Sequence, residues 1–148
     1  MRIAIFGKNC KKEDLCYIED LLSQISLRSD KLIIAKEFFT YLQDKITFPE
    51  NSSIVALEED KISTQQIDVL FSLGGDGTLL DTLSVVKNSC IPVLGINLGH
   101  LGFLTSVGRS DIKNLLAEIE KGHYKFEKHS VLQASCEALV GKRFAINE

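Results

Sequence analysis

The feature that most constrains the fold is an apolar run that ends in a cluster of glycines and is followed by a helical pattern. Residues 67–73, IDVLFSL, are almost continuously hydrophobic, which is typical of a strand buried on both faces of a parallel sheet. Residues 78–88 have helical character, and residues 91–97, IPVLGIN, predict another buried strand. Such alternation predicts an α/β fold with a mostly parallel sheet, whose ligands bind beyond the carboxyl ends of the strands.

Apolar patterns earlier in the chain extend this sheet. Residues 2–7, RIAIFG, predict a first strand, and residues 31–38, KLIIAKEF, predict a second. Between them, apolar residues recur every three or four positions from Glu13, which predicts an amphipathic helix. Its acidic residues, Asp14 among them, are expected to face water.

The remaining segments predict shorter elements. Residues 37–46 predict a helix, and a long connection after them contains a short strand at 54–57. A helix over 110–122 has capping residues at its start and a glycine at its end. From His123 onward the pattern changes to strands joined around 140–142, which predicts a hairpin.

Composition excludes several classes of protein. A net charge of −3 over 148 residues, with no local basic patch, excludes a general nucleic-acid binder. No apolar run is long enough to cross a membrane, and the amino terminus turns charged too early for a secretory signal, so we expect a cytoplasmic protein. The four cysteines have no CxxC spacing, and we expect them to be reduced packing residues.

The glycine cluster lies between a predicted strand and a predicted helix start. Glycines here let a ligand approach the main chain, and the free N–H groups of a helix start attract a phosphate. Asp76, in the middle of the cluster, cannot bind that phosphate directly because two anions repel. It would either accept a proton from an attacking substrate hydroxyl or hold a magnesium ion. The alternative is that Asp76 only caps the helix that follows.

A second glycine-rich turn follows the next strand. Gly95, Gly99 and Gly102 would lie beside the first cluster if the two strands are neighbours. Neither turn has the G-x-G-x-x-G pattern of dinucleotide-binding domains or the lysine of a Walker loop. Phe103 would stack on a base or fill the core, and His100 would serve either as a turn residue or in catalysis.

Three segments together resemble a known family. GGDGTLL at 74–80, GINLGHLGFLT at 95–105 and FAINE at 144–148 are similar to the NAD kinase family. The first segment also occurs in diacylglycerol and sphingosine kinases and, in related form, in phosphofructokinases. The second segment is much more specific, and with the three segments in this order the resemblance runs through the whole chain from Arg2 to Glu148.

The resemblance implies an activity and a set of site residues. Family members transfer a phosphoryl group from ATP, or in some cases polyphosphate, to the 2′-hydroxyl of the adenosine ribose of NAD, with Mg²⁺. By the same resemblance, Asp76 is the general base that takes the hydroxyl proton. The residues that it implies in nucleotide binding are Gly74, Gly75, Gly77, Thr78, Phe103, Asn147 and Glu148. It implies no metal ligand from this chain, and a homo-oligomer, dimer or tetramer, for the full-length protein.

The resemblance also implies a division into domains. We expect a three-layer Rossmann-like kinase domain over 1–122, and at 123–148 a hairpin that begins a truncated β-rich NAD-binding domain. The sequence is therefore interpreted as an amino-terminal fragment, poorly active or inactive by itself. One departure is Asp81, which stands where some relatives carry a basic residue. We therefore assign no phosphate-binding cation to that position.

Two alternatives use the same residues differently. A lipid or sugar kinase would share the GGDGT segment but would leave the segments at 95–105 and 144–148 without a purpose. A non-catalytic nucleotide-binding or assembly module would bind nucleotide without phosphoryl transfer.

Overall fold

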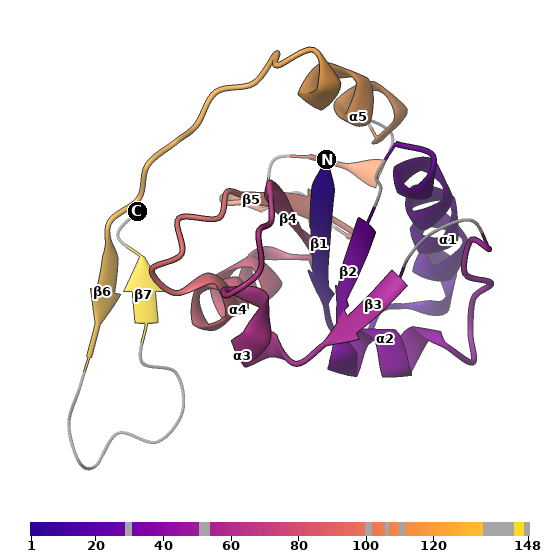
Figure 1. Ribbon diagram of the computed structural model, residues 1–148, viewed down its shortest axis with the longest axis horizontal. Helices are drawn as coiled ribbons and strands as arrows, with labels where there is room; N and C mark the ends of the chain where they lie inside the picture. Colours follow the sequence, from indigo (N-terminus) through magenta and orange to yellow (C-terminus); the bar gives the residue numbers. More distant parts are fainter. Residues whose placement is uncertain are drawn as a thin grey trace.

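The computed structural model describes residues 1–28, 31–50, 54–99, 102–105, 107–109, 112–134 and 144–146. Among these residues, five strands form a parallel sheet (Figure 1). The strands are β1 (Arg2–Gly7), β2 (Lys31–Ala35), β3 (Ile54–Leu57), β4 (Val69–Gly74) and β5 (Val93–Asn97). Their order in the sheet is β3-β2-β1-β4-β5. The chain thus adds β2 and β3 on one side of β1 and then β4 and β5 on the other side.

This order places a change of direction between β1 and β4. The two strands pair in parallel with Ile5 opposite Phe71, and β4 pairs with β5 so that Gly74 lies opposite Asn97. In open parallel sheets the crevice at such a change of direction is the usual ligand site. Here it lies at the carboxyl end of β4, where the glycine cluster begins.

Helices cover both faces of the sheet, which confirms the expected three-layer α/β fold. The helices are α1 (Lys12–Ser26), α2 (Lys36–Leu42), α3 (Glu59–Ile62), α4 (Asp76–Val86) and α5 (Ile112–Glu120). Figure 1 shows α1 and α4 on opposite sides of the sheet. The predicted apolar stripe of α1 is buried at Ile18, Leu21, Leu22 and Ile25. Burying each of these side chains contributes about 1.5–3 kcal/mol.

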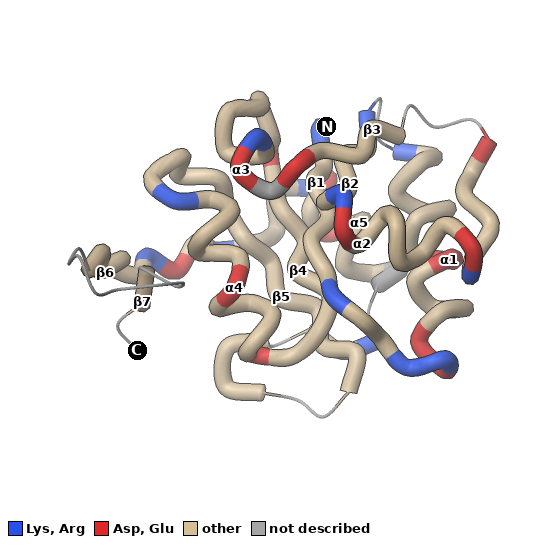
Figure 2. Tube along the Cα trace, turned by 90° about the horizontal axis from the view of Figure 1, so that it is seen from below, with Lys and Arg blue, Asp and Glu red and all other residues tan. Residues whose placement is uncertain are grey.

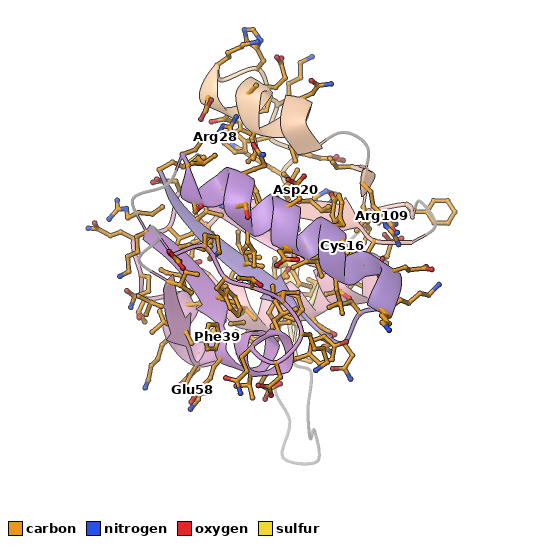
Figure 3. The ribbon with its side chains drawn as sticks, turned by 90° about the vertical axis from the view of Figure 1, so that its right-hand side faces the viewer. Cys16, Asp20, Arg28, Phe39, Glu58 and Arg109 are labelled. Carbon is orange, nitrogen blue, oxygen red and sulfur yellow. The ribbon has the colours of Figure 1, made fainter. Side chains whose placement is uncertain are left out.

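Asp14 corrects one prediction, because its side chain is buried rather than solvent-facing. The residue is only 3% exposed, and its carboxylate accepts a hydrogen bond of 3.0 Å from the Lys11 N–H at the start of α1. Arg109, which precedes α5, forms an ion pair with the same carboxylate. Figure 3 shows Arg109 beside α1. The pairing explains the burial, since a buried carboxylate needs both a cation and hydrogen-bond donors.

Two element boundaries also differ from prediction. β2 ends at Ala35, and α2 begins at Lys36. The short helix α3, Glu59–Ile62, lies within the connection that was predicted to hold only a strand. Glu58, just before α3, forms an ion pair with Lys36. No helix in the described part of the chain has the length and apolar character needed to cross a membrane.

The last described segments form a second, smaller sheet. Strands β6 (Val131–Gln133) and β7 (Phe144–Ile146) pair antiparallel, with Val131 opposite Ile146. The predicted hairpin is therefore present, although its strands are shorter than expected and residues 123–130 contain none. This pair is not hydrogen-bonded to the five-stranded sheet, and β7 contacts α4.

Candidate functional site

The glycine cluster turns the chain from β4 into α4, as predicted. Gly74 has a φ of 155°, and a Cβ at this position would overlap Thr78 Oγ1. Gly75 is the N-cap of α4. No described atom lies within 4 Å of the Cβ that an alanine would add at Gly75 or Gly77. The main chain of these two glycines is therefore accessible to an approaching ligand.

Asp76 is the first residue of α4 rather than its cap. Its carboxylate accepts hydrogen bonds from the main chain of a distant loop: Phe103 N–H donates to Oδ2 at 2.8 Å, Leu104 N–H to Oδ1 at 3.2 Å and Thr105 N–H to Oδ1 at 3.0 Å. The Thr105 hydroxyl lies 2.8 Å from Oδ1. The alternative that Asp76 only caps its own helix is wrong, because α4 has no side-chain cap hydrogen bond.

These donors keep Asp76 ionised. The hydrogen bond from the Thr105 side chain, helped by the main-chain N–H groups of residues 103–105, lowers the pKa of the Asp76 carboxyl below its ordinary value. Partial desolvation raises the pKa of Asp76, but its effect is smaller than that of the Thr105 hydrogen bond. At neutral pH the site therefore presents a negative charge at the amino terminus of α4, where the helix dipole also favours it.

A buried chain of polar groups stands behind Asp76. Asn97 Nδ2 lies 2.8 Å from Thr105 Oγ1, and Gly99 N–H donates to Asn97 Oδ1 at 2.7 Å. Thr105 is 0% exposed and Asn97 is 3% exposed. Asn97 ends β5, so the strand that neighbours β4 fixes the loop that holds Asp76.

The two glycine-rich turns touch, as the sequence predicted for neighbouring strands. A Cβ at Gly102 would overlap the Asp76 carboxylate. A Cβ at Gly95 would come within 2.8 Å of both Leu79 and Thr105. Both positions require glycine because α4 and the loop after β5 approach each other closely there.

A cation bonded to α4, the helix that begins with Asp76, comes from a residue that the sequence analysis did not single out. Lys8, the first residue after β1, forms an ion pair with Asp81 of α4, whose side chain is only 10% exposed. The available signal was a carboxylate on the helix after the glycine cluster together with a lysine directly after the first strand. A hollow of about 210 Å³ adjoins Lys8, and its lining residues are Gly7, Lys8, Asn9, Glu37, Phe38 and Tyr41.

Cys10 lies near this hollow but is not poised as a nucleophile. Tyr41 Oη donates to the Cys10 carbonyl at 2.8 Å, and burial raises the pKa of the Cys10 thiol. A protonated thiol is a poor nucleophile. Cys10, Cys16 and Cys90 are free thiols, but Cys16 and Cys90 are exposed, so the expectation that they are packing residues is wrong for these two. Cys136 lies outside the described residues.

Phe103 projects into solvent. Its residue is 100% exposed, so the alternative that it fills the core is wrong. Its main-chain N–H, in contrast, is anchored on Asp76. Three other residues considered in the sequence, His100, Asn147 and Glu148, lie outside the described residues.

Charges are mixed over the surface. Figure 2 shows Lys and Arg interspersed with Asp and Glu along the described elements rather than gathered on one side.

Comparison with known proteins adds independent information. A family profile described as ATP-NAD kinase N-terminal domain matches residues 5–124. A protein named NAD kinase from Flavobacterium johnsoniae is 31% identical over 100% of this chain and 51% of its own length. The NAD kinases of Bacteroides fragilis and Cytophaga hutchinsonii are 30% and 32% identical over 100% of this chain. The chain spans about half the length of these relatives.

A solved structure has the same fold. The crystal structure of yeast NADH kinase complexed with NADH superimposes with a TM-score of 0.75, over 99% of this chain and 45% of that one. The two sequences are 20% identical. The likeness therefore concerns the arrangement of strands and helices.

Proposed function

The chain belongs to the NAD kinase family, and from this membership we propose that the complete protein transfers a phosphoryl group from ATP or polyphosphate to NAD. The acceptor is the 2′-hydroxyl of the adenosine ribose, and the product is NADP. The observation that carries the proposal is the ionised Asp76 carboxylate, held beside accessible glycine main chain at the carboxyl end of β4. Phosphoryl transfer depends mainly on positioning and electrostatics, which such a corner supplies.

Each part of the corner has a proposed role. Asp76 orients the ribose hydroxyl and accepts its proton. The main-chain N–H groups around Gly75 and Gly77 face phosphate oxygens at the positive end of α4. Thr78 packs against Gly74 and keeps the turn in this shape. The exposed ring of Phe103 contacts the nucleotide.

Asn147 and Glu148 belong to the proposed site through the family resemblance alone. We propose that they bind the hydroxyl and amide groups of the dinucleotide. We also propose that residues 1–122 form a kinase domain and that residues 123–148 begin a β-rich NAD-binding domain. The separate β6–β7 sheet supports this division.

The divalent cation that the family implies does not fit a site built by the described residues. They contain no group of three His, Cys, Asp or Glu side chains able to hold a metal ion. Asp76 already accepts four hydrogen bonds. Mg²⁺ usually keeps several waters and takes substrate phosphates among its ligands, and we propose that the phosphates of the donor would hold it here.

The complete protein is further proposed to act in the cytoplasm as a homo-oligomer. Free thiols support the location. The apolar side chains of Tyr124, Phe126, Val131 and Leu132 are exposed, which supports a covering partner surface.

Replacement of Asp76 tests the proposed function. In the complete protein that carries this chain, Asp76→Asn should lower NADP formation by roughly 10²- to 10⁴-fold, because the general base is lost. NAD binding measured by calorimetry should persist. Asp44→Asn, at an exposed position after α2, is the matched control and should retain full turnover. Unchanged turnover in Asp76→Asn would remove Asp76 from the chemistry, and a wild-type protein that forms no NADP with either donor would refute the proposal.

A further inference from the structure

The oxygen atoms of Asp76 are not equivalent, and the hydrogen bonds behind them explain why. We propose that Thr105, oriented by Asn97, is a positioning residue that occupies Oδ1 of Asp76 and leaves Oδ2 as the atom that receives the substrate proton. This inference rests on the proposed phosphoryl transfer and goes beyond it by assigning the reacting atom and the side chains that select it.

The direction of each hydrogen bond follows from the buried chain. Gly99 N–H can only donate, so the atom of Asn97 that it contacts is the carbonyl oxygen Oδ1. The amide NH₂ of Asn97 therefore faces Thr105 and donates to Oγ1 at 2.8 Å. A hydroxyl has a single hydrogen. Because Thr105 Oγ1 accepts from Asn97, that hydrogen is directed to Asp76 Oδ1, 2.8 Å away.

The two carboxylate oxygens of Asp76 differ in how many hydrogen bonds they already accept. An ionised carboxylate offers about two acceptor positions on each oxygen. Oδ1 accepts from Leu104 N–H, Thr105 N–H and the Thr105 hydroxyl, and it is saturated. Oδ2 accepts only from Phe103 N–H among the described residues. One lone pair on Oδ2 thus remains for a substrate hydroxyl.

Burial of Thr105 and Asn97 stabilises the hydrogen bonds that leave Oδ2 available to the substrate. Thr105 and Asn97 are closed off from solvent, so bulk water does not compete for their hydrogen bonds. Gly102 packs against the carboxylate from the loop side, which limits rotation of Asp76. The carboxylate is therefore presented in one orientation.

The proposed transfer forms one bond to phosphorus and breaks another. The proton of the ribose hydroxyl passes to Asp76 Oδ2 while the hydroxyl oxygen forms a bond to the transferred phosphorus. The bond between that phosphorus and the oxygen of the leaving nucleoside diphosphate, or of the shortened polyphosphate, breaks and its electron pair stays with the leaving oxygen. Asp76 then releases the proton to solvent and returns to its ionised state.

Removal of one hydroxyl tests the inference in the complete protein. Thr105→Val keeps the side-chain volume and deletes the hydroxyl, so the Asp76 carboxylate is held at Oδ1 by the N–H groups of Leu104 and Thr105 alone. We expect kcat to fall about 10- to 100-fold while the KM for NAD changes less than about threefold, since a hydrogen bond to a charged group is lost. The acid limb of the kcat/KM profile should move to higher pH, because the pKa of Asp76 rises when its strongest donor is removed.

Two variants control for simple loss of packing. Thr105→Ser keeps the hydroxyl and should restore both kcat and the position of the acid limb. Thr82→Val deletes the hydroxyl of another buried threonine, which donates to Leu79 O within α4, and should leave both unchanged. Wild-type kcat and acid limb in Thr105→Val, or equal effects in Thr82→Val, would overturn the inference.

A second measurement needs neither activity nor a folded valine variant. In the wild-type protein, proton NMR should resolve the Thr105 hydroxyl at neutral pH, because a buried hydroxyl that donates to a carboxylate exchanges slowly. The side-chain carboxyl carbon of Asp76 should titrate below the ordinary aspartate pKa of about 3.9. Failure of either observation would overturn the positioning role even if NADP is formed. A protein that satisfies both but forms no NADP would refute the proposed function and retain the hydrogen-bond assignment.

Discussion

Gly102 shows how the chemistry of one side chain restricts another residue. The Asp76 carboxylate occupies the space in which any side chain at Gly102 would begin, so the loop can donate its N–H groups only if this position has no Cβ. The glycine-rich turn after β5 is therefore explained by close approach to a carboxylate. A phosphate ligand is not needed to account for this particular glycine.

Asp76 also makes stability depend on pH. Its pKa is lower in the folded protein than in the unfolded chain, so its hydrogen bonds add stability above the unfolded pKa of about 3.9, and this stability is lost as pH falls through the folded value. We therefore expect Asp76→Asn to melt below the wild type at pH 7, and the gap to close in the acid range. Scanning calorimetry across pH measures this. Gly108→Ala, at an open position without a titratable group, should show a gap that does not change with pH.

At the scale of elements, the described part of the loop between β5 and α5 is attached to helices of both layers. Residues 103–105 are bonded to α4 through Asp76, and Arg109 is bonded both to the Leu98 carbonyl and to Asp14 of α1. The loop thus connects the helices on the two faces of the sheet. Its shape depends on both layers.

Arg109→Ala tests the second attachment. The change leaves the Asp14 carboxylate, 4% exposed, without its cation, so we expect the free energy of unfolding to fall by about 1–3 kcal/mol. Urea denaturation measures the loss. Arg28→Ala removes a more exposed ion pair with Glu120 and should cost about 0–1 kcal/mol. A smaller loss for Arg109→Ala than for Arg28→Ala would contradict the role given to this loop.

The elements differ in how far the sequence predicts them. Apolar runs predict β1, β4 and β5 within two residues, because a strand buried on both faces leaves a continuous signal. The four-residue helix α3 leaves none. The contact of Asp14 with Arg109 and that of Lys8 with Asp81 join residues from different elements. Local periodicity cannot predict such pairs, and the hydrogen bonds from residues 103–105 to Asp76 are missed for the same reason.

In the whole molecule, the parallel sheet is well covered, whereas the segment after α5 is exposed. The central strands are buried, whereas residues 123–134 are exposed throughout. Figure 1 shows this segment running from α5 to the β6–β7 pair beyond α4. An exposed apolar stretch of this kind is normally covered by further protein.

The exposed apolar side chains of this segment predict a contact between subunits of the proposed homo-oligomer. In the complete protein, replacement of Phe126 and Leu132 by serine should shift the sedimentation coefficient towards a smaller species, because two exposed apolar side chains of the proposed contact are removed. Leu27→Ser, at a leucine after α1 that is even more exposed than Leu132, should leave the assembly unchanged. An oligomer that survives the double serine variant would place the subunit contact elsewhere.

The bonds that fix the Asp76 carboxylate have a consequence for how the protein is made. They join residues only 27 to 29 positions apart. Of the two strands that pair with β4, β1 precedes it in the chain and β5 follows it. A chain emerging from the ribosome can therefore assemble its reactive corner as soon as Arg109, which attaches the same loop to α1, is outside the exit tunnel. The corner would be complete while translation of the later residues is still under way.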